Sequence, residues 1–105
     1  MTLYEIAKVI RSKNAGPFTL TIDVMFGSEV EMNEVLEADE FSTRAIAALY
    51  DVSVDSVLLH VMASACAVKV TLPRKVASGS PGDRDVYGSQ QHMALASVVL
   101  PERNT

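Results

Sequence analysis

A polar, glycine-punctuated stretch holds the side chains best suited to chemistry. Residues 78–92 read SGSPGDRDVYGSQQH, between two apolar segments that a short turn would have connected. Polar loops that are longer than a fold requires often carry binding groups. Tyr87 and His92 are its candidate proton-transfer residues, and Gln90 and Gln91 are amides that could orient a ligand. The alternative is that the histidine only makes ordinary structural hydrogen bonds.

A first cationic cluster is the segment RSKNAG at residues 11–16. Arg11 offers a two-pronged guanidinium and Lys13 a mobile ammonium group, both suited to a carboxylate or phosphate, with Asn14 as a polar neighbour. The alternative interpretation is structural. If a helix ends here, the two cations complement its dipole and the asparagine caps it.

A second cationic cluster is the segment KVTLPR at residues 69–74. On a strand, Lys69 lies on the face opposite the apolar side chains, because successive residues alternate. A lysine within an apolar strand is exposed or paired, and Asp23 on another predicted strand is a candidate partner if the two strands are neighbours. An ordinary ion pair and an anion site that includes Lys69 and Arg74 are both consistent with this segment.

Metal and nucleophile chemistry have little support in the sequence. Asp83 and Asp85 have no histidine or cysteine at metal-ligand spacing, so we expect no metal site, and no cofactor is implied. His60 lies within an apolar run and is expected to be a structural histidine. Cys66 has no adjacent base and is expected to be a small core residue.

Length and overall charge limit the functional classes. A chain of 105 residues suits one domain covering residues 1–105. The net charge of −4 argues against nucleic-acid binding, which depends on a cationic surface. No apolar run reaches the roughly 18 residues of a membrane span, and the start lacks the pattern of a signal peptide. With a single cysteine, these features predict a cytoplasmic protein.

The charge is unevenly distributed along the chain. Residues 27–55 contain eight acidic residues and one arginine, a net charge of −7, so the rest of the chain carries +3 to reach the total of −4. An acidic region with a basic region elsewhere suits a protein that binds a small anion or docks an oriented partner. The alternative is a solvated acidic helix surface with no partner.

The elements that must position these residues follow from apolar periodicity. A capping box of Thr2 and Glu5 predicts a first helix that continues through Ile10 and stops at residues 13–17. Strict alternation over residues 18–26 predicts a half-buried strand.

Later elements are predicted in the same way. Helices begin at Ser28 and Ser42. Residues 57–62 and 66–72 are predicted as strands, joined by a tight link at residues 63–65 or forming one bent strand. A final strand is predicted over 93–100, after the polar loop. Four strands and about three helices indicate an α+β class, a ferredoxin-like two-layer sandwich with a mostly antiparallel four-stranded sheet.

Three segments in combination resemble a known family. They are residues 7–18 (AKVIRSKNAGPF), 67–74 (AVKVTLPR) and 78–92. The family consists of bacterial proteins of about one hundred residues whose function is unassigned, and which accompany acyclic terpene utilisation (AtuA-like) proteins. The resemblance implies a small ferredoxin-like partner domain in acyl or organic-acid catabolism, and it carries over no catalytic residue.

Together the motifs and the resemblance lead to one main functional hypothesis. The chain is expected to be a small subunit that completes a carboxylate, phosphate or acyl-CoA site with a larger AtuA-like protein, for instance in a lyase or hydratase step. Arg11, Lys13, Asn14, Lys69, Arg74, Gln90, Gln91 and His92 are expected to converge on one surface. The alternatives are a stand-alone homo-oligomeric enzyme and a binding module without chemistry.

Overall fold

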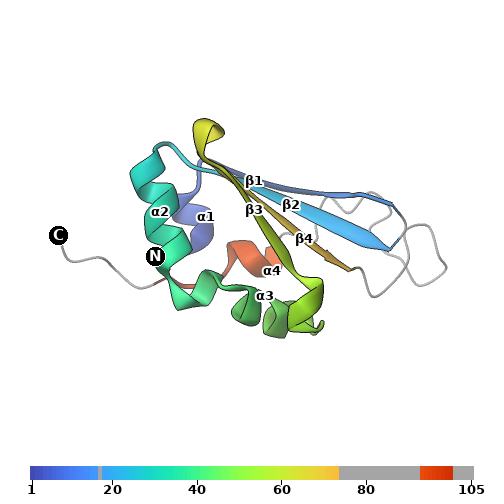
Figure 1. Cartoon of the computed structure of the whole chain (residues 1–105). Helices are drawn as coiled ribbons and strands as arrows, with labels where there is room; N and C mark the ends of the chain where they lie inside the picture. Colours follow the sequence, from blue (N-terminus) through green and yellow to red (C-terminus); the bar gives the residue numbers. More distant parts are fainter. Residues whose placement is uncertain (17, 74–92, 101–105) are drawn as a thin grey trace.

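The domain is built around an antiparallel four-stranded sheet in the order β1-β2-β4-β3. The computed structural model describes residues 1–16, 18–73 and 93–100, and the other residues lie outside its described part. The strands are β1 (Val9–Asn14), β2 (Thr19–Met25), β3 (Leu58–Met62) and β4 (Ala67–Pro73). Figure 1 shows the helices together on one side of the sheet. The predicted α+β class with a four-stranded antiparallel sheet is therefore confirmed.

Along the chain, the four strands form two hairpins, and helices lie between the two hairpins. The first hairpin is β1-β2, the second is β3-β4, and β2 pairs with β4 at the centre. Between the hairpins lie α2 (Glu29–Glu37), α3 (Thr43–Tyr50) and the 3-10 turns η1 (Asp39–Phe41) and η2 (Val54–Ser56). A ferredoxin-like chain has the order β-α-β-β-α-β. This domain shares the layers and the antiparallel pairing of that fold, with its own order along the chain.

The N-terminal segment differs from the sequence-based prediction. The helix expected to continue through Ile10 is only one turn long, α1 (Leu3–Ile6), and β1 begins at Val9. The predicted capping box is present: the Glu5 amide donates to the Thr2 hydroxyl, and the Glu5 carboxylate accepts from the Thr2 amide at 2.9 Å. A four-residue helix is marginal by itself, whereas β1 pairs with β2 along all six of its residues. Strand pairing therefore outweighs the helical periodicity here.

Gly16 closes the β1-β2 hairpin. Its φ is +113°, which side-chain-bearing residues rarely adopt, and the Ala15 amide donates to the Thr19 carbonyl at 2.9 Å. The glycine predicted to stop a helix instead turns the chain between two strands.

The C-terminal segment also differs from the prediction. The strand expected over residues 93–100 is a short helix, α4 (Met93–Ala96), followed by an isolated bridge between Thr2 and Val99. Leu95 is fully buried, so a single helical turn is enough to place it in the core. A short apolar run fits either a strand or a buried helix, and periodicity alone does not separate the two.

The two ends of the described chain are bonded to each other. The Leu3 amide donates to the Val98 carbonyl at 2.9 Å, and the Leu100 amide donates to the Met1 carbonyl at 2.8 Å. These bonds join residues 1–3 to residues 98–100 at one edge of the helical layer.

The remaining sequence signals are largely confirmed. Ser28 and Ser42 are N-caps: their hydroxyls accept from the amides of Glu31 at 3.2 Å and Ala45 at 3.1 Å. The tight link between the last two strands is the 3-10 turn η3 (Ala63–Ala65). It ends at Cys66, which is half-buried with a left-handed φ of 50° and so is a turn residue more than a core one.

One hydrophobic core fills the space between the helices and the sheet. In each central strand, alternate residues enter it, as the period-two pattern predicts. Its fully buried large side chains are Phe41, Leu3, Leu20, Ile22, Met32, Ile46, Leu72, Leu95, Val24, Val35, Val68 and Val70. In the described residues, no helix is long and apolar enough to cross a bilayer.

Tyr50 links α3 to α4 by a hydrogen bond, and its hydroxyl makes the free energy of unfolding depend on pH in the alkaline range. Its hydroxyl accepts from the Leu95 amide at 3.2 Å, and burial raises its pKa to about 12. The unfolded chain loses the tyrosine proton near pH 10, so between about pH 10 and 12 the unfolded state is favoured increasingly. We therefore expect the free energy of unfolding to be unaffected by this group below pH 10 and to fall above it.

The Tyr50→Phe variant checks this expectation. Removing the acceptor should lower stability at pH 7 by about 1 kcal/mol, and urea unfolding at pH 9 to 11 should show a weaker decline with pH than in the parent protein. The exposed Tyr4 provides the matched control. Its Phe variant should leave both the stability and the pH dependence unchanged, and an equal decline in all three proteins would contradict the assignment to Tyr50.

Candidate anion-binding face of the sheet

The sheet has one face packed on the helices and one that the described helices leave uncovered. We call the uncovered side the outer face. Alternation and strand register place on it Val9, Arg11, Lys13, Thr19, Thr21, Asp23, Met25, Leu58, His60, Met62, Ala67, Lys69, Thr71 and Pro73. Half-polar strands of this kind are typical of antiparallel sheets with one face turned away from the core.

A row of four ionisable residues crosses the outer face, one from each strand. Arg11 of β1 is opposite Asp23 of β2. Asp23 is in turn opposite Lys69 of β4, and Lys69 is opposite His60 of β3. We call these four residues the charged row. Directly opposed residues have their Cβ atoms about 5 Å apart, so Arg11 and Lys69 flank the Asp23 carboxylate, and His60 lies beyond Lys69 at the sheet edge.

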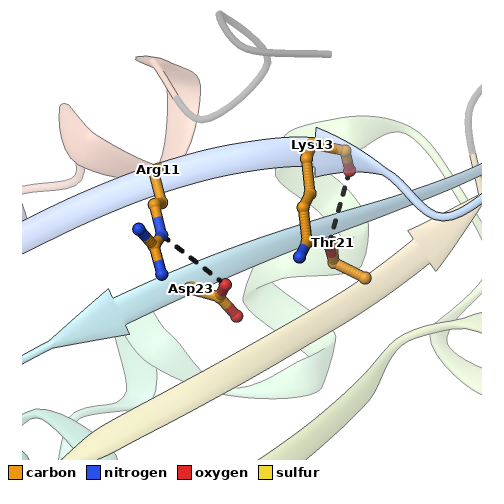
Figure 2. Close-up of polar contacts among 4 residues, drawn as sticks. All are labelled: Arg11, Lys13, Thr21 and Asp23. Atoms are coloured by element: carbon orange, nitrogen blue, oxygen red, sulfur yellow. Dashed lines mark hydrogen bonds and ion pairs between the residues drawn. The ribbon is translucent and has the colours of Figure 1, made fainter. Parts of the chain in front are cut away.

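The carboxylate of Asp23 is only loosely paired. Arg11 Nε lies 3.9 Å from Asp23 Oδ2, with 67% of the arginine side chain and 14% of the aspartate side chain exposed (Figure 2). This separation is too long for a hydrogen bond, and an exposed ion pair of this kind contributes about 0 to 1 kcal/mol. Most of the hydrogen-bonding capacity of the Arg11 guanidinium is therefore available to another anion.

The other oxygen of Asp23 is buried. Among the described residues, Asp23 Oδ1 has no hydrogen-bond donor. Buried polar atoms are nearly always hydrogen-bonded. A carboxylate oxygen only accepts hydrogen bonds and opposes a nearby anion, so the anion-binding groups of the charged row are the cationic side chains of Arg11 and Lys69.

Lys13 adds a third cation to the same face. It is one of the exposed residues of β1, and its side chain extends toward β2 on the same side of the strand as Arg11 (Figure 2). The Thr21 hydroxyl donates to the Lys13 carbonyl at 3.4 Å. Lys13, Thr21, Thr71 and Leu58 form a second row across the sheet, parallel to the charged row. Of its two threonines, Thr21 is buried and uses its hydroxyl in the bond to Lys13, whereas Thr71 is half-buried and lies in the row beside Lys69.

The structure places only some of the sequence-predicted residues. It brings Arg11, Lys13 and Lys69 onto one face, and it places Asn14 in register with Leu20, on the side of the sheet that packs on the helices. Because Arg11 and Lys13 belong to a strand, the alternative that they complement a helix dipole does not apply. Arg74, Tyr87, Gln90, Gln91 and His92 lie outside the described residues, so their convergence on this face stays a prediction.

His60 is the residue that sequence reasoning misjudged. It was expected to be structural because the run around it is apolar, but it is exposed on β3, at the edge of the sheet. The useful signal is its spacing: Leu59 and Val61 point to the opposite face, so His60 shares the face of Lys69. In the described part of the chain, no group of three or more His, Cys, Asp or Glu side chains has the geometry to hold a metal ion.

The fold and this face define a small α+β domain with an acidic helical layer and a basic, hydroxyl-bearing sheet surface. The chain belongs to the family described as a domain of unknown function, DUF4387, whose model matches residues 3–99. The match confirms membership of a small uncharacterised family, which the resemblance in the sequence predicted in part. No curated protein matches the chain. No solved structure matches it either.

Proposed function

We propose that this domain is a companion subunit that docks by its outer face on a larger AtuA-like protein and contributes cations to an anion site between them. The observation that carries the proposal is the set of cations on the outer face: the Arg11 side chain is 67% exposed and only loosely paired with Asp23, and Lys13 and Lys69 lie on the same face. These cations leave hydrogen-bonding capacity that an anion between two protein surfaces would use. The AtuA-like partner is suggested by the sequence resemblance.

Charge segregation supports oriented docking. The acidic segment, residues 27–55 with a net charge of −7, supplies α2 and α3 on the helical side of the sheet. Arg11, Lys13 and Lys69 lie on the opposite side. An approaching acidic surface is attracted to the outer face and repelled by the helical layer. This arrangement favours one orientation of the domain in a complex.

The chemistry of the face favours a carboxylate or a phosphate as the bound group. An arginine binds such planar or tetrahedral oxyanions through two parallel hydrogen bonds, and lysines add point charge. A flat sheet does not enclose a small substrate by itself, whereas ligand sites are usually concave. In this proposal, the surface of a second protein completes the site. For a lyase or hydratase step in the complex, His92 and Tyr87 are the proposed proton donors.

A capture experiment with charge-reversal variants tests the proposal. The tagged chain is used to isolate its partner from native cell extract, followed by mass spectrometry and native mass measurement. The parent protein should retain one larger protein in fixed stoichiometry. Arg11→Glu should reduce capture at least tenfold, because the reversal opposes the field of the outer face. Arg44→Glu is the matched control, since Arg44 is an exposed arginine of α3 on the helical side.

The outcomes separate the alternatives. Loss of the partner with Arg11→Glu and its retention with Arg44→Glu support docking by the outer face. Equal loss with both variants indicates dependence on net charge alone and contradicts the proposal. Capture of no partner at all, with phosphate binding by the isolated chain, would indicate the anion-binding module instead.

A further inference from the structure

The two edges of the sheet differ in their protection against pairing with another strand. The edge strands are β1 and β3. Exposed edges are normally blunted by charged side chains, especially lysine, or by proline. β1 is protected in this way by the exposed Arg11 and Lys13. β3 reads LLHVM and contains no lysine, arginine, acidic residue, proline or glycine.

The β3 edge also exposes apolar side chains. Leu58 is 63% exposed and Val61 is 46% exposed, on opposite faces of the same short strand. Val54, in the turn η2 that leads into β3, is 46% exposed. None of the described residues outside β4 pairs with this strand. An uncharged edge with exposed apolar residues on both sides is a template for a further strand.

We propose that a second copy of this chain pairs with β3, edge to edge and antiparallel, to give a dimer with a continuous eight-stranded sheet. A two-fold axis through His60, the middle residue of β3, allows all five residues of the strand to pair with the second copy. It places His60 opposite its own copy, Leu58 opposite Met62, and Leu59 opposite Val61. Each apolar residue then meets an apolar residue on the same face of the sheet, because directly opposed residues share a face.

Self-complementarity favours a second copy over a different partner strand. The edge carries no fixed charge that would select a partner of opposite sign. The nearest acidic residue in the sequence, Asp55, lies in η2 outside the five paired residues, so the two-fold register pairs no acidic residues. A symmetric interface of this kind requires a self-complementary patch, and β3 supplies one.

The pairing joins the two charged rows end to end. His60 is the β3 member of each row, so a line of eight ionisable residues would cross the combined outer face, from Arg11 of one copy to Arg11 of the other. The dimer therefore presents two copies of the candidate anion site on one continuous surface. This inference does not depend on the identity of the larger partner.

A charge-swap experiment at position 60 tests the two-fold register. The full chain should be a dimer by light scattering and native mass measurement at micromolar concentration. His60→Lys and His60→Glu should each weaken dimerisation about tenfold or more, because two like charges face each other about 5 Å apart. An equimolar mixture of the two variants should recover the dimer as a Lys–Glu pair. This recovery is expected only if residue 60 of one copy contacts residue 60 of the other.

Substitutions on the other sheet edge provide the control. Val9→Lys and Val9→Glu, at a 40% exposed residue of the β1 edge, should each leave the dimer intact. Far-UV circular dichroism shows whether each variant is folded. In the parent protein, amide hydrogen exchange should show β3 amides that do not bond to β4 becoming at least tenfold more protected as concentration rises into the dimer range, with no such change in β1.

Three results would overturn the inference. A parent chain that is monomeric at high micromolar concentration excludes the dimer. A dimer that is insensitive to charge at position 60, or is disrupted equally by the Val9 substitutions, places the interface elsewhere. Should the position-60 variants fail to fold, the exchange measurement on the parent chain decides alone, and concentration-independent exchange in β3 would exclude the pairing.

Discussion

Replacing Leu20 with alanine is expected to destabilise the domain by about 3 kcal/mol. Leu20 is 1% exposed and lies in β2, which is paired on both sides, by β1 and by β4. Truncating a buried leucine removes its transfer free energy and leaves a cavity that close-packed neighbours fill only partly. Small domains are stable by only about 5 to 15 kcal/mol. The loss should be measured as a lower midpoint of urea unfolding.

Leu49→Ala provides the matched control for the same chemical change. Leu49 lies in α3 and is 42% exposed, so a large part of its side chain already contacts water and less burial is lost than at Leu20. We expect a loss of under 1 kcal/mol. Equal losses in the two variants would contradict the assignment of Leu20 to the buried core.

Replacing Asp23 with asparagine is expected to raise the affinity of the isolated domain for phosphate about tenfold, since removing one negative charge about 5 Å from a bound anion changes its energy by this order. The carboxylate lies between Arg11 and Lys69 and offsets the field of both. The asparagine keeps the size of the side chain. Calorimetric titration with inorganic phosphate at low ionic strength measures the effect, and added salt should reduce it.

Asp39→Asn separates a local effect from a change in net charge. Asp39 is exposed in η1, on the helical side of the sheet, and its substitution changes the total charge by the same amount. The affinity for phosphate should change less than twofold in this variant. Weaker phosphate binding by Asp23→Asn would show that the carboxylate organises the cations, and the proposed site would have to be revised.

Much of the fold could be predicted from the sequence because particular residues determine the secondary structure of their own segment. The strict alternation around Ile22 predicts β2, and the serines at positions 28 and 42 predict the starts of α2 and α3. The two errors have one physical cause. Residues 9–14 and 93–100 are short segments whose secondary structure depends on distant partners. Pairing with β2 makes the first a strand, and a helical turn places Leu95 of the second in the core.

The candidate site could be predicted only in part. The sequence shows that Lys69 needs an explanation, and it names Asp23 as a neighbour if their strands pair, which the register confirms. It does not show that Arg11 lies on the other side of Asp23 from Lys69, because the sequence predicts a helix for most of the segment that forms β1. Site geometry depends on strand order, and strand order is a long-range property that periodicity does not encode.

The hydrogen bonds between residues 1–3 and 98–100 have a consequence for how this domain can be tethered. A linker attached at either end of the described chain starts from the same corner of the helical layer. Adjacent termini tolerate fusion and permutation, and the effective concentration of a tethered domain depends on where its linker begins. Linkers of equal length that start at residue 1 or at residue 100 should therefore present the outer face with similar reach.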